Sequence, residues 1–111
     1  MRDARLDRAA RRYAEYLAAH GILEHEVDVP GMRTPELRAA AEGAMERYVG
    51  ETLALLASTP ESAARRTVQL WSESPDHRRV MLRSAYRRAG IGIAMDDERV
   101  LYVVLMYAPG D

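Results

Sequence analysis

The sequence predicts an α+β domain, a three-layer α-β-α sandwich with a small, mainly antiparallel sheet. Two observations carry this prediction. Three helix starts of one kind are spread along the chain, and its last third holds two apolar runs separated by acidic residues, the pattern of a β-hairpin. Helices before, between and beside such strands are expected to cover both faces of the sheet. With 111 residues, residues 1–111 are expected to form a single domain that buries about two-thirds of its unfolded surface.

The opening segment, 5–20, is predicted to be an amphipathic helix. Its apolar side chains recur at helical spacing and are Leu6, Ala9, Ala10, Tyr13, Tyr16 and Leu17. Gly21 suits the left-handed conformation that commonly ends a helix. Residues 21–33 are expected to form a loop, in which Pro30 and Gly31 indicate a turn.

Three later helices are predicted to begin with the same device. The starts are Thr34-Pro35-Glu36, Thr59-Pro60-Glu61 and Ser74-Pro75-Asp76. The hydroxyl accepts from a free backbone N–H, proline lacks the donor that would go unpaired, and the acid complements the helix dipole. We therefore expect helices over 34–46, 59–72 and 74–83.

The remaining apolar segments predict strands. Residues 48–57 are best interpreted as a buried strand, with a helix as the alternative. Residues 89–95 and 100–107 flank three acids and predict a hairpin, and Gly90-Ile91-Gly92 indicates close backbone packing on its first strand. Because 101–107 has no polar interruption, both faces of the last strand are expected to be covered. An edge position, with pairing to a partner, is the other possibility for this strand.

Composition excludes several classes of function. The net charge of −1 provides no global field toward nucleic acid or anionic lipid. The arginine pairs have no interleaved aromatic residues and are balanced by 17 acids, so we expect solvated helix faces and no nucleic-acid binding. No cysteine is present, so disulfides contribute nothing to stability and cysteine content does not indicate the redox compartment. No apolar run reaches the length of a membrane span.

Three short blocks each carry a chemically useful side chain. They are Gly21-Ile22-Leu23-Glu24-His25, Gly50-Glu51-Thr52 and Trp71-Ser72-Glu73-Ser74-Pro75-Asp76-His77-Arg78. His77 would lie at the start of a helix, where the dipole favours the neutral imidazole that metals bind. Two imidazoles and Glu51 together would leave an open coordination position, as in catalytic zinc sites. The structural alternative is that His25 and His77 are hydrogen-bonded within the fold and Glu51 ties loops or helix ends together.

In this order and at these intervals, the blocks resemble the CAP superfamily. These are the cysteine-rich secretory proteins, antigen 5 and pathogenesis-related 1 proteins, and the likeness is to the shorter, cysteine-free bacterial branch. It covers nearly the whole chain and includes Gly31, Thr34, Pro35 and Arg38 as well as Gly90-Ile91-Gly92. No single piece is specific, but the ordered set is. The resemblance implies the α-β-α fold and a cavity lined by His25, Glu51 and His77.

The chain departs from the family pattern at two positions. Thr52 stands where the family usually has asparagine, and Ser74 stands where animal and plant members have a second cavity glutamate. Glu73 is one residue away, about 100° around a helix, and is the substitute candidate for that place. Trp71 is expected to pack in the core near the cavity, with ligand stacking as a secondary role.

The resemblance implies a non-catalytic, extracytoplasmic binding or interaction module. His25 and His77 are candidates to hold zinc or another divalent metal, and lipid, peptide, glycan and protein ligands all stay open. The alternative is a metal-dependent, peptidase-like hydrolase with Glu51 as general base. No Gly-x-Ser-x-Gly elbow supports a serine hydrolase. No signal peptide precedes the first helix, so a trimmed chain and one domain of a longer precursor both stay open.

Overall fold

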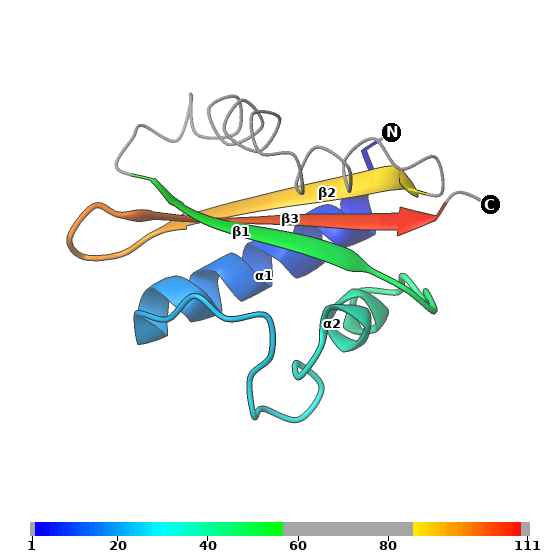
Figure 1. Cartoon of the computed structure of the whole chain (residues 1–111), viewed down its shortest axis with the longest axis horizontal. Helices are drawn as coiled ribbons and strands as arrows, with labels where there is room; N and C mark the ends of the chain where they lie inside the picture. Colours follow the sequence, from blue (N-terminus) through cyan, green and yellow to red (C-terminus); the bar gives the residue numbers. More distant parts are fainter. Residues whose placement is uncertain (1, 57–85, 110–111) are drawn as a thin grey trace.

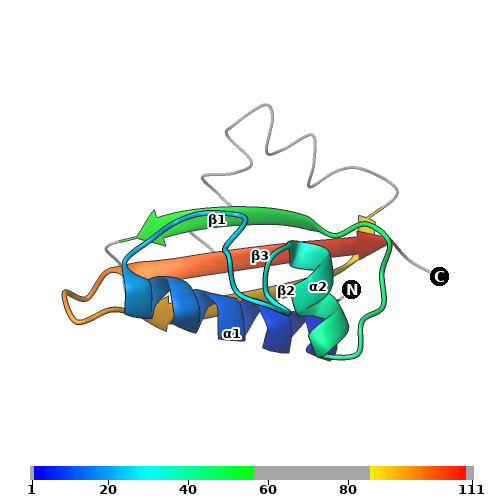
Figure 2. The ribbon, with the colours of Figure 1, turned by 90° about the horizontal axis from the view of Figure 1, so that it is seen from below.

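The computed structural model describes residues 2–56 and 86–109, which form an α+β fold (Figure 1). Helices α1 (Ala4–His20) and α2 (Pro35–Ala41) precede strand β1 (Gly50–Leu56), and β2 (Tyr86–Met95) and β3 (Leu101–Pro109) follow. Both helices lie on the same face of the sheet (Figures 1 and 2). The predicted fold class is confirmed. The helices predicted over 59–72 and 74–83, which would cover the second face, lie outside the described residues.

Helix α1 begins at a cap and ends at the predicted glycine. The Asp3 carboxylate accepts from the backbone N–H groups of Arg5 and Leu6, and Gly21 has a left-handed φ of 64°. The buried residues of α1 are Leu6, Ala9, Ala10, Tyr13, Ala14 and Leu17. These are the side chains that helical spacing predicted, apart from Tyr16, which packs partly buried against the same core, and Ala14.

Helix α1 lies directly on the backbone of β2. A Cβ atom placed on Gly90 would overlap the backbone of Leu6 and Asp7, and one on Gly92 would overlap Arg11. Any side chain at these two positions would push the helix off the sheet. The predicted role of this Gly-x-Gly pair in close backbone packing is thus visible in the structure.

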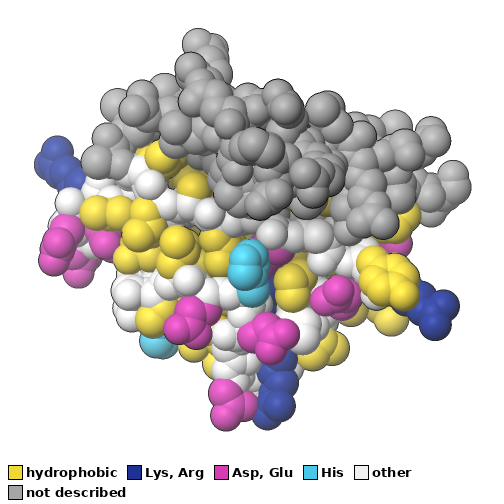
Figure 3. All heavy atoms as spheres, viewed as in Figure 1, with side chains coloured by type: hydrophobic (Ala, Val, Ile, Leu, Met, Phe, Trp, Pro, Cys, Tyr) yellow, Lys and Arg dark blue, Asp and Glu magenta, His cyan; other side chains and the backbone are white. Residues whose placement is uncertain are grey.

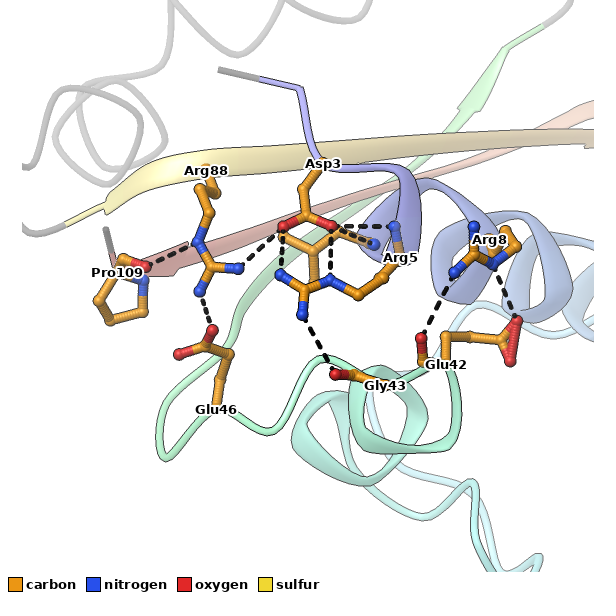
Figure 4. A network of polar contacts seen from close by, with 9 residues as sticks. Asp3, Arg5, Arg8, Glu42, Gly43, Glu46, Arg88 and Pro109 are labelled. Atoms are coloured by element: carbon orange, nitrogen blue, oxygen red, sulfur yellow. Dashed lines mark hydrogen bonds and ion pairs between the residues drawn. The ribbon is translucent and has the colours of Figure 1, made fainter. Parts of the chain in front are cut away.

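The start of α1 is also tied to the far end of the chain by a network of polar contacts (Figure 4). The guanidinium of Arg88 on β2 lies 2.8 Å from the Asp3 carboxylate and pairs with Glu46 as well. Its Nε donates to the carbonyl oxygen of Pro109, and Arg5 forms a second ion pair with Asp3. The network therefore joins the α1 start, the loop before β1, and both hairpin strands.

Helix α2 begins as predicted and ends earlier. The Thr34 hydroxyl accepts from the backbone N–H of Leu37, and Pro35 is the first helical residue. The predicted end at residue 46 is wrong, because Gly43 adopts a φ of 92°. The N–H of Ala44 then donates to the carbonyl oxygen of Ala39, and the N–H of Gly43 donates to that of Ala40. This is the Schellman motif, which satisfies the last carbonyls and ends the helix.

The described strands form an antiparallel sheet in the order β1-β3-β2. β1 pairs with β3 from Gly50 opposite Tyr107 to Leu56 opposite Leu101, so the strand reading of 48–57 is confirmed over the residues of β1. The predicted hairpin is also confirmed, and the Asp96 carboxylate accepts two backbone N–H groups in its turn. β3 is buried on both faces, as predicted, and is central, so its alternative reading as an edge strand is wrong.

Candidate functional site

The structure brings His25 and Glu51 together. Nδ1 of His25 lies 2.9 Å from Oε1 of Glu51, which joins the loop after α1 to the first half of β1. The Glu51 side chain is 1% exposed, whereas that of His25 is 60% exposed. The pair thus runs from the interior to the surface. The other predicted site residues, Trp71, Glu73 and His77, lie outside the described residues.

Arg38 of α2 completes this cluster. Its Nη2 lies 2.8 Å from Oε2 of Glu51 and also donates to the carbonyl oxygen of His25. Nη1 donates to the carbonyl oxygen of Met32 at 2.6 Å. Both members of the ion pair are almost fully buried. Each oxygen of the Glu51 carboxylate is therefore engaged, one by Arg38 and the other by His25.

Sequence reasoning placed Arg38 in the family pattern but gave it no role. One local signal was available. Arg38 is followed by a run of alanines and preceded by Leu37, which is an apolar setting for a permanently charged side chain. Buried charges in proteins are paired, so this setting called for an acidic partner elsewhere in the chain. Only the folded structure identifies that partner as Glu51.

Tyr13 of α1 supports Arg38 from the side of the helix. The guanidinium carbon of Arg38 lies 3.5 Å from the centre of the Tyr13 ring, a cation–π contact. Burial raises the pKa of Tyr13 to about 12, so its hydroxyl stays protonated and donates to the carbonyl oxygen of Glu24. Tyr13 and Arg38 together hold the backbone of the loop on both sides of the His25 side chain.

Burial and the neighbouring side chains act in opposite directions on Glu51. Burial raises the pKa of the Glu51 carboxyl, and the Arg38 guanidinium and the His25 hydrogen bond oppose that rise. The Glu51 carboxylate can accept from an Nδ1–H of His25. In the tautomer protonated at Nδ1, the free lone pair of the ring is on Nε2. A carboxylate behind an imidazole is the arrangement that orients histidine ligands of metals.

Comparison with known families identifies the chain. The model of the cysteine-rich secretory protein family, or CAP family, matches residues 1–107. The chain belongs to this family. No curated protein matches it in sequence. Membership of the family therefore rests on the family model, and the solved structures show the shared fold.

The solved structures of three proteins show the same CAP fold. An outer surface protein from Borrelia burgdorferi has a TM-score of 0.76 and 21% identity, over 98% of this chain and 77% of that one. An extracellular protein with an SCP domain from Bacillus anthracis has a TM-score of 0.73 and 18% identity, over 98% of this chain and 33% of that one. Venom allergen-like protein 4 of Schistosoma mansoni has a TM-score of 0.66 and 15% identity, over 100% of this chain and 68% of that one.

The His25–Glu51 cluster supplies only part of the ligand set of a divalent metal. His25 offers Nε2, while both oxygens of Glu51 are engaged, so Glu51 fits the role of an orienting group behind the ligand. Within residues 2–56 and 86–109, no group of three acidic, histidine or cysteine side chains could hold a metal ion. A metal on His25 therefore needs a further ligand, and His77 is the residue that the family pattern supplies.

Thr52, which replaces the usual asparagine of the CAP family, does not belong to the His25–Glu51 cluster. Neighbouring residues of a strand point to opposite faces of the sheet. The buried Thr52 hydroxyl donates to the hydroxyl oxygen of Tyr107 at 3.1 Å, so it contacts β3 on the face opposite α1. The substitution thus leaves the contacts of Glu51 with Arg38 and His25 in place.

A pocket of about 290 Å³ opens beside Arg38, between the two helices and the turn at residues 30–32. Its lining residues are Ala9, Arg12, Tyr13, Pro30, Gly31, Met32, Arg38 and Ala41. The walls are mainly apolar, and Tyr13 and Arg38 form part of them. No helix in the described part of the chain is long and apolar enough to cross a membrane.

Proposed function

We propose that this CAP domain is a non-catalytic, extracytoplasmic binding module whose ligand contacts the exposed edge of His25. One observation carries the proposal. An exposed imidazole is held by a buried carboxylate, which is itself held by a buried arginine. Fixing one exposed ring with two buried charges is costly for stability alone. It is useful where Nε2 must face a ligand in one orientation and one tautomer.

The proposed ligand site includes a divalent metal bound by His25 and His77. Glu51 accepts from Nδ1 of His25 and so leaves Nε2 as the metal-binding atom. This geometry supports a ligand role for His25 and an orienting role for Glu51. A bound metal would supply a Lewis-acidic centre that recognises an electron-rich group of the ligand.

The same contacts favour binding over hydrolysis. A general base must be within reach of the water whose proton it takes. The Glu51 side chain is almost fully buried, with one oxygen on Arg38 and the other on His25. In this arrangement, burial keeps solvent water away from the carboxylate. The hydrolase alternative therefore has less support from the geometry than the binding module.

The proposed location outside the cytoplasm rests on family membership and on two structural neighbours. One of these neighbours is described as an outer surface protein and another as an extracellular protein. A domain with no cysteine is compatible with either redox environment. We extend the location of these neighbours to this chain as part of the proposal.

Calorimetric titration with zinc near neutral pH tests the proposal. We expect stoichiometric binding to the wild-type chain, loss of binding in His25→Ala and His77→Ala, and affinity lowered by about 10–100-fold in Glu51→Gln. His20→Ala is the matched control, because His20 stacks on Tyr16 at the end of α1 and should leave binding unchanged. Absence of zinc binding to the folded wild type would refute the metal site. Peptide hydrolysis that Glu51→Gln abolishes would refute the non-catalytic assignment.

A further inference from the structure

The two edges of the sheet are treated differently by the fold. The outer edge of β2 is occupied by the start of the chain. The backbone N–H of Asp3 donates to the carbonyl oxygen of Ala89 at 2.8 Å, and Arg2 forms a parallel β-bridge with the same residue. The Asp7 carboxylate accepts from the backbone N–H of Ile91 at 2.9 Å. Backbone groups of Ala89 and Ile91 on this edge are therefore already paired with the start of the chain.

The outer edge of β1 has no such contacts in the part of the chain that the structure describes. There, the ladder of β1 runs only to β3. The strand, Gly50–Leu56, also lacks the lysine, arginine and proline residues that commonly protect an edge. Its one charge is Glu51, whose side chain is buried. Among the residues that the structure describes, this edge thus presents backbone donors and acceptors without the usual protection.

Apolar and site residues lie along this edge. Leu55 on β1 is 47% exposed, and Leu23, in the loop that carries His25, is also exposed. The His25–Glu51 hydrogen bond holds that loop against β1, and the loop passes beside the strand in Figure 2. Hydrophobic side chains gather over this part of the surface (Figure 3). The edge and the candidate site are therefore continuous.

We propose that the ligand of this domain is an extended peptide segment of a partner protein, which adds as a strand to the outer edge of β1 and passes His25. The inference rests on the proposed binding function and names its ligand class. A polypeptide offers alternating N–H and C=O groups at the spacing of a strand. Apolar side chains at every second position would pack on Leu23 and Leu55. The seven residues of β1 would pair with a segment of similar length.

A displayed library of random octapeptides, selected on the full chain, tests this proposal. We expect an enriched peptide with alternating apolar residues, and about tenfold or greater loss of its affinity in Leu55→Lys, since a lysine on the edge opposes strand pairing. Met95→Lys is the matched control, because Met95 is similarly exposed, at 54%, on the other edge strand. It should bind the peptide like the wild type.

N-methylation of the enriched peptide separates backbone pairing from side-chain contact. Methyl groups on the amides that face β1 should abolish binding, whereas methyl groups on alternate amides, which face away, should not. The proposal is overturned if no peptide is enriched, if both methylated forms bind equally, or if Met95→Lys loses as much affinity as Leu55→Lys. A wild-type dimer that Leu55→Lys dissociates would also overturn it, because a second copy would then occupy the edge.

His25→Ala distinguishes failure of this inference from failure of the proposed function. If the peptide pairs with β1 and contacts His25, this variant should bind it more weakly. Binding should still be abolished only by methyl groups on the amides that face β1, which is the pattern expected for the wild type. Unchanged affinity in His25→Ala, with the pattern intact, would retain the edge site and refute the role of His25. Loss of the pattern in the wild type, with zinc binding intact, would refute the edge site alone.

Discussion

Two buried arginine–carboxylate clusters lie on the helical side of the molecule, and they differ in where they end. In the cluster at the start of α1, Arg88 contacts Asp3, Glu46 and a backbone carbonyl, so its contacts stay within the protein (Figure 4). In the other cluster, the chain of contacts runs from Arg38 through Glu51 to an exposed imidazole. We call the first cluster closed, because even its exposed member, Arg5, donates to Asp3 and to the carbonyl oxygen of Gly43. We call the second open, because it ends at the exposed ring of His25.

This difference separates a structural network from a candidate site. Both clusters bury an arginine against a carboxylate, and both join segments distant in sequence. Burial and charge alone therefore do not mark function. What distinguishes the open cluster is that its last member, His25, faces solvent with one ring nitrogen committed to Glu51. Removal of the outermost residue should accordingly affect ligand binding in the open cluster and stability in the closed one.

The largest expected effect is removal of Arg38. Arg38→Met leaves the Glu51 carboxylate buried without its cationic partner, which should lower the free energy of unfolding by about 3–5 kcal/mol. Urea denaturation measures the loss. In the double variant Arg38→Met, Glu51→Leu, both charges are absent, and much of the stability should return. A double variant no more stable than the single one would show that the ion pair is not the cause.

Asp3→Ala should have the next largest effect on stability. The change removes the N-cap of α1 and the ion pairs with Arg5 and Arg88, and we expect a loss of about 2 kcal/mol. Zinc and peptide binding by the remaining folded protein should be unchanged. In Asp3→Asn, which keeps a side-chain oxygen for the cap, the loss should be smaller. Equal losses in both variants would assign the effect to the ion pairs alone.

The closed cluster should also make the free energy of unfolding depend on pH in the acid range. Hydrogen bonds from Arg5, with those from Arg88 and the helix N–H groups, hold the pKa of Asp3 well below its usual range, against the effect of burial. An acid with a lowered folded-state pKa stabilises the fold above its unfolded pKa of about 3.9 and loses that contribution as the pH falls below it. The stability difference between wild type and Asp3→Asn should therefore shrink below about pH 4.

Urea denaturation at several pH values checks this prediction. Asp28→Asn is the control, because Asp28 is exposed and its ion pair with Arg33 lies on the surface, where such pairs contribute about 0–1 kcal/mol. Its difference from the wild type should stay small at every pH. A pH response as large as that of Asp3→Asn would show that general acid titration, and not the cluster, is responsible.

His25→Ala should have the smallest effect on stability. The ring is 60% exposed, and water can replace its hydrogen bond to Glu51, so we expect a loss of about 1 kcal/mol or less. The same variant should lose zinc binding. A loss as large as that in Asp3→Ala would contradict the contrast between the open and closed clusters, because His25 would then be a structural residue.

Local sequence signals predicted much of this fold, and long-range contacts explain most of what they missed. Capping residues and apolar periodicity located α1, the start of α2 and the hairpin because these features depend on neighbouring residues. The signal for the end of α2 was also local, at Gly43, but Schellman contacts were needed to interpret it. The central place of β3 and the partner of Arg38 depend on residues far apart in sequence, which spacing alone does not reveal.

The candidate site was predicted to a similar degree. Family resemblance, and not spacing, brought His25 and Glu51 into one hypothesis, and the structure places them within hydrogen-bonding distance. Their grouping with His77 stays a prediction. Arg38 and Tyr13 could not be assigned to the site from sequence, because their roles depend on the path of the loop between the two helices. Both side chains donate to backbone carbonyl oxygens of that loop, and a backbone carbonyl is present at every residue, so the sequence does not mark the acceptors.

The contact of α1 with the two glycines of β2 has a consequence for how the chain reaches its native state. Helix α1 is synthesised before strand β2, which carries Gly90 and Gly92 of its docking surface. Asp3 and Arg88, which join the two regions, are 85 positions apart. Closing so large a loop carries an entropy cost that must be met before the contacts form. The apolar face of α1 therefore cannot be buried against β2 until that strand has also been synthesised.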